Sequence, residues 1–386
     1  MDLIFAVRQL QEMHYEYAID ILMAFLDIEK AYDSVCRSKV WNSLENRNVP
    51  KQTIGRIREM YNGSVSCVKV GGERSDWLKQ KNGLRQGSAL SPLLFIVVMD
   101  DIMTKVAQEI GEGKMKAMLF ADDLMIWGNK EEEVQEQLDV WERIAQDYGM
   151  KFSTNKSEMI ITSRTKERGT TGITIGGEQL RKVESFKYLG SLIQENGRND
   201  REINERGRKA EAFRQSVRSL IWSKDVPQNT KKVIYRTYYA PILTYASETW
   251  VMKGRERSKI QASEMKFLRS SIGVTKMDRL RNEKVRELVK EEALQDKIEK
   301  ARLKWYGHVK RMEGKRIPRR IHETEMKGKR PRRRPRDRWL KGVEECVLKK
   351  GEDWTKVKTE RWWEDRRRWR GLCSKQTQPE AGNCSR

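Results

Sequence analysis

The chain has 386 residues, and its 79 Lys and Arg against 56 Asp and Glu give a formal charge of +23. Hydrophobic residues make up only 37%, and no stretch approaches the roughly 20 consecutive apolar residues of a membrane-spanning helix, which excludes a membrane protein. The five cysteines include no CxxC pair and the N-terminus lacks a signal-peptide layout, so we expect an intracellular protein of the nucleus or cytoplasm without disulfides.

The positive charge is concentrated toward the C-terminus. Residues 1–160 carry −5, residues 161–300 carry +12 and residues 301–386 carry +16. A strongly basic segment of this kind indicates a polyanionic partner.

Apolar runs at 21–26, 115–120, 124–127 and 158–162 predict strands, the middle two forming a hairpin. Gly pairs at 71–72 and 176–177 predict further hairpin turns. The spacing of apolar residues and the position of Pro92 predict helices over 4–17, 92–109 and 131–148. Beyond residue 200 nearly everything reads as helix, over 200–222, 227–239, 257–272 and 280–312. We therefore expect an α+β domain followed by a helical one.

Candidate chemistry comes from carboxylates, because the chain has three histidines and no nucleophile or phosphate-loop motif. Asp27 ends an apolar strand, and Asp122 and Asp123 stand at the tip of an apolar hairpin. Carboxylates that converge repel one another unless cations neutralise them, and oxygen ligands alone favour Mg²⁺ or Mn²⁺. Two such ions would serve a phosphoryl transfer. The alternative for an Asp-Asp turn taken alone is a solvated hairpin.

Five motifs make the interpretation specific. In order they are FLDIEKAYD (25–33), GLRQGSALSPLLF (83–95), FADD (120–123), GMKFSTNKSEM (149–159) and KYLGS (187–191). They resemble the palm and primer-grip motifs of reverse transcriptases from non-LTR (LINE-like, RTE-type) retrotransposons. RLKWYGHVKRM (302–312) and GKRPRRRPRDRWL (328–340) resemble the C-terminal region of these elements.

The resemblance implies a right-hand polymerase fold, an antiparallel palm sheet with packed helices, and roles for single residues. Asp27, Asp122 and Asp123, with the backbone carbonyl of Ile28, would bind two Mg²⁺ or Mn²⁺ ions. Lys156 matches a lysine proposed to protonate the leaving pyrophosphate.

Three further residues would bind substrates. Tyr32 would be the aromatic gate beside the sugar 2′ position, and Gln86 and Gly87 would line the template and nucleotide pocket. Tyr32 could instead be ordinary core, Gln86 a polar residue at a helix entry, and Lys156 a solvated lysine. Asp100-Asp101 mimics the aspartate hairpin, but it falls late in a predicted helix and we treat it as a decoy.

Most of the family's fingers motifs would precede Asp27, and only 26 residues do so here. We therefore expect a 5′-truncated copy or a mis-started gene model. The expected organisation is 1–195, palm with a remnant of the fingers; 196–300, helical thumb-like region; and 301–386, a basic Trp/Arg-rich tail that binds nucleic acid.

In this tail we expect phosphate contacts from Arg332, Arg333 and Arg334, and stacking of unpaired bases on Trp362 and Trp363. The alternative for the charge run is a solvated face.

The function that these observations predict is RNA-directed DNA synthesis onto a primer 3′ end, with an RNA template, a DNA primer and deoxynucleoside triphosphates as partners. The alternative is a catalytically inactive relic that binds nucleic acid. The sequence leaves the oligomeric state undetermined.

Overall fold

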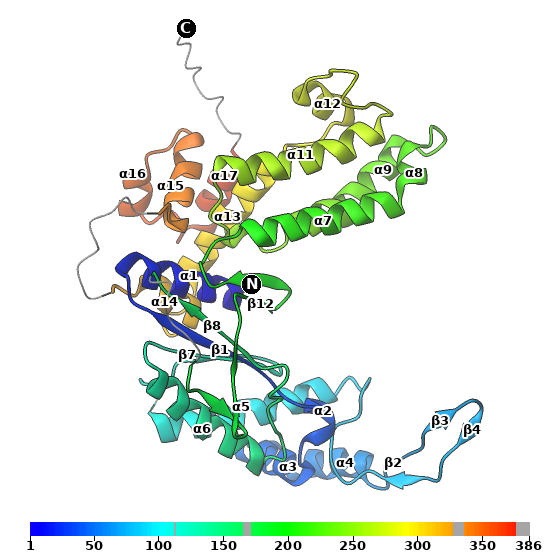
Figure 1. The fold of residues 1–386 in the computed structure, drawn as a ribbon, viewed down its shortest axis with the longest axis vertical. Coiled ribbons are helices and arrows are strands. Elements are labelled where there is room, and N and C mark those ends of the chain that lie inside the picture. The colour runs from blue at the N-terminus through cyan, green and yellow to red at the C-terminus, as the bar shows by residue number, and fades with distance from the viewer. Residues whose placement is uncertain (112, 165–170, 327–335, 376–386) are drawn as a thin grey trace. The chain divides into compact units, whose positions relative to one another are not determined.

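The structure, a computed structural model, describes residues 1–111, 113–164, 171–326 and 336–375 (Figure 1). The chain forms two compact units. The sheet unit is Asp20–Glu184, and the helical unit combines Met1–Ile19 with Ser185–Arg386. The described residues form one hydrophobic core in the sheet unit and two in the helical unit.

A five-stranded sheet in the order β11-β8-β1-β7-β6 organises the sheet unit. The central strand β1 (Ile21–Asp27) is antiparallel to β7 (Asp123–Gly128) and to β8 (Glu158–Thr162). The outer strands are β6 (Ala117–Phe120) and β11 (Arg181–Lys182). The strands expected from the apolar runs, including the hairpin that ends in Asp122-Asp123, are confirmed.

Helices cover one face of this sheet. Leu22, Ala24 and Leu26 of β1 join the core with Phe95 and Trp141. The helices are α2 (Ala31–Ser34), α3 (Arg37–Asn46), α4 (Lys51–Tyr61), α5 (Ser91–Ile110) and α6 (Glu131–Asp147), which confirms the two helices expected over 92–109 and 131–148. Because side chains alternate along a strand, Asp27 lies on the opposite face from Leu22, Ala24 and Leu26.

Three short hairpin pairings complete the sheet unit: β2 (Val65–Ser66) with β5 (Leu78–Lys79), β3 (Lys69–Val70) with β4 (Glu73–Arg74), and β9 (Thr174–Ile175) with β10 (Glu178–Gln179). Both expected glycine turns are present, at Gly71-Gly72 and Gly176-Gly177, and all four glycines have positive φ. Two consecutive positive φ values are typical of a type I′ turn, which glycine adopts without strain. The β3–β4 hairpin projects from the helices of its unit (Figure 1).

In its described part the helical unit contains one hairpin, β12 (Ser185–Tyr188) with β13 (Ser191–Gln194), besides its helices. The helices are α1 (Asp2–Tyr17), α7 (Asp200–Ser216), α8 (Arg218–Trp222), α9 (Gln228–Ile234), the π-helix η1 (Tyr235–Tyr239), α10 (Ala240–Thr244), the 3₁₀ helix η2 (Ser247–Thr249), α11 (Gly254–Ser271), α12 (Asn282–Val289), α13 (Leu294–Arg311), α14 (Ile317–Glu323), α15 (Trp339–Lys349), α16 (Trp354–Thr359) and α17 (Arg366–Ser374). Within the described ranges no helix combines the length and apolar content needed to cross a bilayer.

Two helices expected from the sequence are each divided in two. The region 200–222 consists of α7 and α8, which are separated at Val217. The region 280–312 breaks between α12 and α13, where Lys290 takes a left-handed conformation with φ 56° and ends α12. Because the apolar periodicity resumes after this break, the spacing of apolar residues in the sequence did not indicate that the helix ends there.

The described part of 301–386 packs as one body with the rest of the helical unit. Phe5 of α1 contacts Trp339 and Trp305, with ring centroids 4.8 and 5.8 Å apart, and joins a core of aromatic residues from α13 to α17. The compact units therefore divide the chain at 19/20 and 184/185, whereas the expected domains were 1–195, 196–300 and 301–386. The composition identified 301–386 as a separate basic segment, but its buried aromatic side chains pack against α1 and so join it to the helical unit.

Candidate active site

Asp27 and Asp123 occupy directly paired positions on the antiparallel strands β1 and β7. The Asp27 carbonyl accepts a hydrogen bond from Ser153 N–H (2.8 Å), so its backbone bonds toward β8 and leaves a non-hydrogen-bonded pair toward β7. In such pairs the Cα atoms are about 4.5 Å apart and the side chains leave the same face of the sheet. Two carboxylates held this close repel each other in the absence of a cation.

Asp122 lies in the tight turn between β6 and β7, next to this pair. Ala121, also in the turn, has φ 52°, a left-handed conformation that costs a residue with a Cβ roughly 1–2 kcal/mol. Burial, followed by the negative charges of Asp122 and Asp27, raises the pKa of Asp123. The three carboxylates therefore lie close enough to influence one another electrostatically.

The Ile28 carbonyl also belongs to this edge of the sheet. Ile28 forms an isolated antiparallel bridge with Phe152. The two hydrogen bonds of this bridge join the neighbouring residues, from Glu29 N–H to Lys151 O (2.8 Å) and from Ser153 N–H to Asp27 O. In this pattern the bridged residue points its own N–H and C=O away from its partner, toward the β7 side. The Ile28 carbonyl thus faces the side that carries Asp122 and Asp123.

Lys156 contacts the cluster directly. Its Nζ lies 3.5 Å from Asp27 Oδ2, although 72% of the lysine side chain is exposed. Ser157 is buried beside it, and its hydroxyl oxygen accepts a hydrogen bond from Asp27 N–H (3.3 Å). An exposed ion pair of this kind contributes about 0–1 kcal/mol, so Lys156 can leave Asp27 at little cost.

Tyr32 lies in the short helix α2, and Gln86 lies on a loop of the same unit. Tyr32 is half-buried and stacks on Phe95 at a centroid distance of 4.8 Å. Gln86 is exposed, and its amide donates to both oxygens of Asp33 at 3.1 and 3.2 Å. Gly87 has φ 81° and open space where a Cβ would project.

Two glycines that hold these loops together belong to the recognised motifs but had no expected role. A Cβ on Gly83 would lie 2.6 Å from the Asp33 carbonyl oxygen, and one on Gly149 would lie 2.9 Å from the Ser34 carbonyl oxygen. Both have positive φ, and both close approaches are to the backbone of α2, the turn that carries Tyr32. Gly83 and Gly149 each begin one of the recognised motifs, and this position was the sign in the sequence that could have indicated a role for them.

Arg37 is a third residue that sequence reasoning missed. Its guanidinium donates to the carbonyls of Gly83 (2.9 Å), Gln80 (2.9 Å) and Tyr61 (3.2 Å), and so anchors the loop that precedes Gln86. A single arginine among 79 basic residues carries no sequence signal of this kind.

Across the described ranges, no three Asp, Glu, His or Cys side chains form a ready metal site. The fit to a divalent cation therefore rests on the paired backbone positions of Asp27 and Asp123, the mutual charge effect on Asp123, and a donor set made of oxygen alone. These features suit Mg²⁺ or Mn²⁺, for which Asp27, Asp122, Asp123 and the Ile28 carbonyl are the available donors.

Asp100-Asp101, the pair that mimics the aspartate hairpin in sequence, has a structural role instead. Asp101 is buried in α5 and accepts hydrogen bonds from Ser43 Oγ (2.8 Å) and the Tyr148 hydroxyl (2.5 Å), while Asp100 pairs with Arg47 on the surface. Asp101 therefore ties α5 to α3 and to the end of α6.

The hairpin β12–β13 contains the motif that resembles a primer grip. Its turn, Leu189-Gly190, has positive φ at both residues, as in a type I′ turn. The Tyr245 hydroxyl donates to Leu189 O (2.7 Å), Arg206 donates to Gly190 O, and Glu202 accepts from Leu192 N–H (2.8 Å). Buried charged groups of the helical unit therefore hold this turn.

The expected stacking role of the tail tryptophans needs a correction. Trp362 and Trp363 are only 8% and 6% exposed, so their ring faces are not available for stacking on bases. Arg368 covers the ring of Trp362 and Trp363 meets Tyr306 edge to face, because the small C-terminal helices need these rings as their core. Arg332, Arg333 and Arg334 lie outside the described residues.

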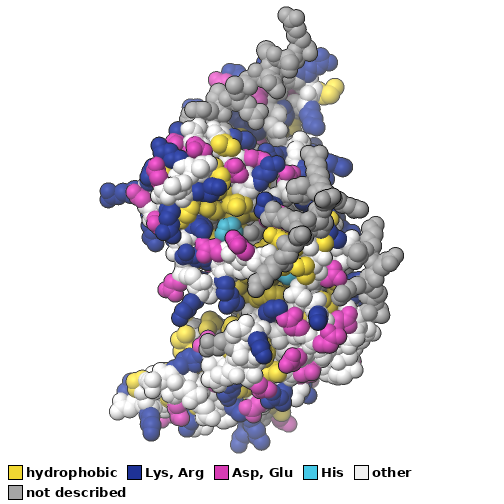
Figure 2. All heavy atoms as spheres, turned by 90° about the vertical axis from the view of Figure 1, so that its left-hand side faces the viewer, with side chains coloured by type: hydrophobic (Ala, Val, Ile, Leu, Met, Phe, Trp, Pro, Cys, Tyr) yellow, Lys and Arg dark blue, Asp and Glu magenta, His cyan; other side chains and the backbone are white. Residues whose placement is uncertain are grey.

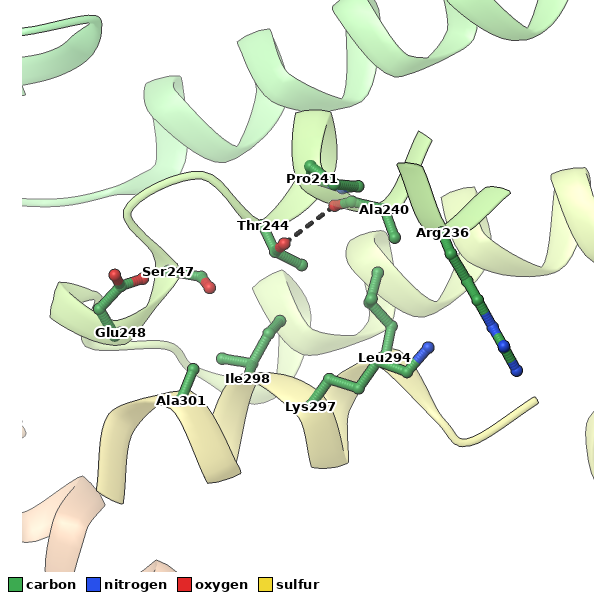
Figure 3. A pocket seen from close by; sticks show the side chains of 10 residues that line it. All are labelled: Arg236, Ala240, Pro241, Thr244, Ser247, Glu248, Leu294, Lys297, Ile298 and Ala301. Atoms are coloured by element: carbon green, nitrogen blue, oxygen red, sulfur yellow. Dashed lines mark hydrogen bonds between the residues drawn. The ribbon is translucent and has the colours of Figure 1, made fainter. Parts of the chain in front are cut away.

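A hollow of about 300 Å³ in the helical unit lies between α10 and α13 (Figure 3). Its two cations, Arg236 and Lys297, both pair with the buried Glu291, at 2.6 and 3.0 Å. Burial raises the pKa of Glu248 on its other side. The hollow contains none of the residues singled out from the sequence, and both of its cations are already paired.

Comparison with known proteins shows which family part of the chain resembles. Residues 5–193 match the family described as "Reverse transcriptase (RNA-dependent DNA polymerase)". Residues 5–193 are thus similar to a reverse transcriptase domain, and they include the sheet that carries the aspartate cluster.

The relatives that match come from retrotransposable and mobile elements. The chain is 28% identical over 190 residues to the Pol polyprotein from retrotransposable element R2 of Nasonia vitripennis, covering 46% of this chain and 18% of the relative. It is 26% identical over 271 residues to the RNA-directed DNA polymerase from mobile element jockey of Drosophila melanogaster, covering 67% and 29%. The chain thus spans less than a third of either relative.

Among solved structures, a Candida tropicalis telomerase in complex with a telomeric RNA fragment matches with 12% identity and a TM-score of 0.39, over 84% of this chain and 52% of that one.

Proposed function

We propose that the sheet unit catalyses RNA-templated addition of deoxynucleotides to a primer 3′ end. The observation that carries the proposal is the pairing of Asp27 with Asp123 across β1 and β7, with Asp122 in the adjoining turn. Two Mg²⁺ or Mn²⁺ ions, when bound there, would supply charge stabilisation for the attacking and leaving oxygens of the transfer. Asp27, Asp122, Asp123 and the Ile28 carbonyl would hold them.

The surrounding residues would position the substrates. Tyr32, fixed by its stack on Phe95, would lie beside the sugar of the incoming nucleotide and exclude a 2′-hydroxyl by overlap. Gln86 and the open backbone at Gly87 would contact the template and the nascent base pair, since a glycine allows close approach. Lys156, next to Asp27, would donate a proton to the leaving pyrophosphate.

The partners in this proposal are an RNA template, a DNA primer and deoxynucleoside triphosphates. The family match and the polymerase relatives support this substrate class. Assignment to the RTE type of element stays a prediction.

The test is primer extension on an RNA template by the purified chain with Mg²⁺ or Mn²⁺. The comparison is between Asp122→Asn and Asp100→Asn, which removes the same charge from the surface of α5. We expect Asp122→Asn to reduce extension by at least about 100-fold, the size of effect seen when one electrostatic interaction with a transition state is removed. Asp100→Asn should retain activity.

Equal activity of the two variants would show that the site is assigned wrongly. If the wild-type chain binds primer–template but extends no primer, the chain is an inactive relic and the proposal is overturned.

A further inference from the structure

Asp33 is a carboxylate of the first motif to which the catalytic proposal gives no role. It lies in α2, six residues after Asp27, a spacing that would let it join the other aspartates of the site. Burial, followed by the charges of Asp122 and Asp27, raises the pKa of Asp123, and Asp33 takes no part in this effect. The side chain of Asp33 is therefore separate from the aspartate cluster.

The partner of Asp33 is a neutral amide. Gln86 Nε2 donates to Asp33 Oδ1 at 3.1 Å and to Oδ2 at 3.2 Å. Both side chains are exposed, and within the described residues Asp33 forms no ion pair. A hydrogen bond in which one partner is ionised is roughly twice as strong as a neutral one, so this contact favours one orientation of the Gln86 amide.

The neutral partner distinguishes Asp33 from two other exposed aspartates of the sheet unit. Figure 2 shows Asp and Glu side chains among Lys and Arg over one face of the protein. Asp100 and Asp147 follow this pattern, since they pair with Arg47 and Lys39. The carboxylate of Asp33 neutralises no cation of this kind and instead holds an uncharged side chain.

Backbone contacts fix the two segments that carry this pair. Leu84 N–H donates to Tyr32 O (2.7 Å), and Gly83 N–H donates to Val35 O (2.8 Å). A Cβ on Gly83 would lie 2.6 Å from the Asp33 carbonyl oxygen, so the two backbones are in close contact. The loop that begins at Gly83 is therefore attached to α2, and the side-chain contact lies on a fixed framework.

The contact determines which end of the Gln86 amide is free. An ionised carboxylate only accepts hydrogen bonds, so Asp33 holds the NH2 end and leaves the oxygen Oε1 on the other side of the amide. No donor in the described part of the chain bonds to this oxygen. The neighbouring Gly87 has open space where a Cβ would project. An oriented acceptor with open space beside it suits a hydrogen-bond donor of a bound substrate.

We propose that Asp33 is a positioning residue, which orients Gln86 so that its amide oxygen accepts a hydrogen bond from a hydroxyl or amino group of the incoming nucleotide. The inference rests on the proposed function, which places Gln86 in the template and nucleotide pocket. It adds to that function a residue that contacts neither the metal ions nor the substrate.

The test measures the affinity of a deoxynucleoside triphosphate for the full chain bound to an RNA template and a dideoxy-terminated DNA primer, with Mg²⁺. Because this primer has no 3′-hydroxyl, binding is measured without chemistry. The same template with an ordinary primer gives kcat and KM. Thermal unfolding checks that each variant folds.

Three variants change the pair. Asp33→Ala removes the carboxylate and leaves Gln86 free to rotate. Gln86→Glu places two carboxylates opposite each other, and they repel. Asp33→Asn combined with Gln86→Glu exchanges the donor and the acceptor, which restores the hydrogen bond, keeps a free acceptor oxygen at position 86 and keeps the net charge of the wild-type pair.

The matched control is Asp139→Ala. It removes an exposed carboxylate that accepts a hydrogen bond from a glutamine amide, that of Gln135, at 2.6 Å on α6.

We expect Asp33→Ala and Gln86→Glu each to weaken nucleotide binding about tenfold and to raise KM by a similar factor, at the lower end of what a hydrogen bond to a charged group contributes. Their kcat should change by less than about threefold, because the lost contact acts on binding. The exchanged pair should bind within about threefold of the wild type, and Asp139→Ala within about twofold. All unfolding midpoints should stay close to that of the wild type, since the side chains are exposed.

An exchanged pair that binds no better than Gln86→Glu alone would overturn the proposal, and so would wild-type affinity in Asp33→Ala. If the wild type binds the nucleotide but extends no ordinary primer, the catalytic proposal fails while the affinities still decide the role of Asp33. If the wild type binds no nucleotide, both proposals are overturned.

Discussion

The ring of Tyr32 lies stacked on that of Phe95, with 4.8 Å between centroids and 18° between the ring planes. Phe95 is fully buried in the core of the sheet unit, whereas Tyr32 is half-buried. Packing therefore fixes one face of the Tyr32 ring. A rigid steric gate requires such packing, but an ordinary core residue would show it as well.

The first prediction separates these two interpretations. Tyr32→Ala should raise incorporation of ribonucleotides relative to deoxynucleotides, because the bulk that excludes a 2′-hydroxyl is removed. Tyr32→Phe keeps the ring and should keep the discrimination. The measurement is the ratio of kcat/KM for the two nucleotide types in primer extension. An unchanged ratio in Tyr32→Ala would leave Tyr32 as core packing only.

The second prediction uses two glycines in one motif. Gly83→Ala forces a Cβ against the backbone of Asp33 at positive φ, so it should lower the free energy of unfolding by about 2–4 kcal/mol. Gly87→Ala has the same sign of φ but open space around the Cβ, so it should cost only about 1 kcal/mol.

Urea unfolding measures both. If Gly87 lines the template pocket, Gly87→Ala should still weaken primer–template binding in a folded protein. Equal stabilities of the two variants would contradict the close backbone approach at Gly83.

The third prediction follows from the burial of the tail tryptophans. Trp363→Ala should destabilise the chain by about 3–5 kcal/mol, the usual cost of truncating a buried aromatic side chain. It should not change the preference between single-stranded and duplex nucleic acid in the remaining folded fraction. Trp77, which is 63% exposed on the sheet unit, provides the control, and Trp77→Ala should change stability by less than about 0.5 kcal/mol.

The measurement is the unfolding midpoint of each variant. A selective loss of single-strand binding in Trp363→Ala, without loss of stability, would restore the stacking role.

The fourth prediction concerns Glu12 in α1. Burial raises the pKa of Glu12 to about 7 from its ordinary 4.5, and one of its carboxylate oxygens accepts a hydrogen bond from Trp339 N–H (2.9 Å). Between these two pH values the folded chain holds a proton that the unfolded chain has released. The contribution of Glu12 to stability is therefore most favourable below about pH 4.5 and declines as the pH rises to about 7.

Glu12→Gln removes this dependence and keeps an acceptor for Trp339. Relative to the wild type, the variant should become more stable as the pH rises through this window, by about 1.4 kcal/mol per pH unit at most. Chemical unfolding at several pH values measures the difference. A constant difference would show that Glu12 ionises alike in both states.

The sequence by itself determined the sheet that carries the carboxylates and the order of its strands along the chain. Apolar runs ending at Asp27 and flanking Asp122-Asp123 have the length and periodicity of strands and a tight turn, and these are local properties. Helical spacing of apolar residues is also a local property, so the sequence predicts the helix over 92–109. Because Asp100-Asp101 falls late in this helix, the sequence also excludes that pair from the candidate active site.

Only the tertiary structure decided what the side chains touch. The pairing of Asp27 with Asp123, the contact of Lys156 with Asp27 and the clash that Gly83 avoids all join residues distant along the chain. The tail shows the same limit, because its sequence combines tryptophans with arginines and only the packing shows that Trp362 and Trp363 lie in the core. Composition specifies which residues can bind a polyanion, whereas packing determines which of them remain exposed to do so.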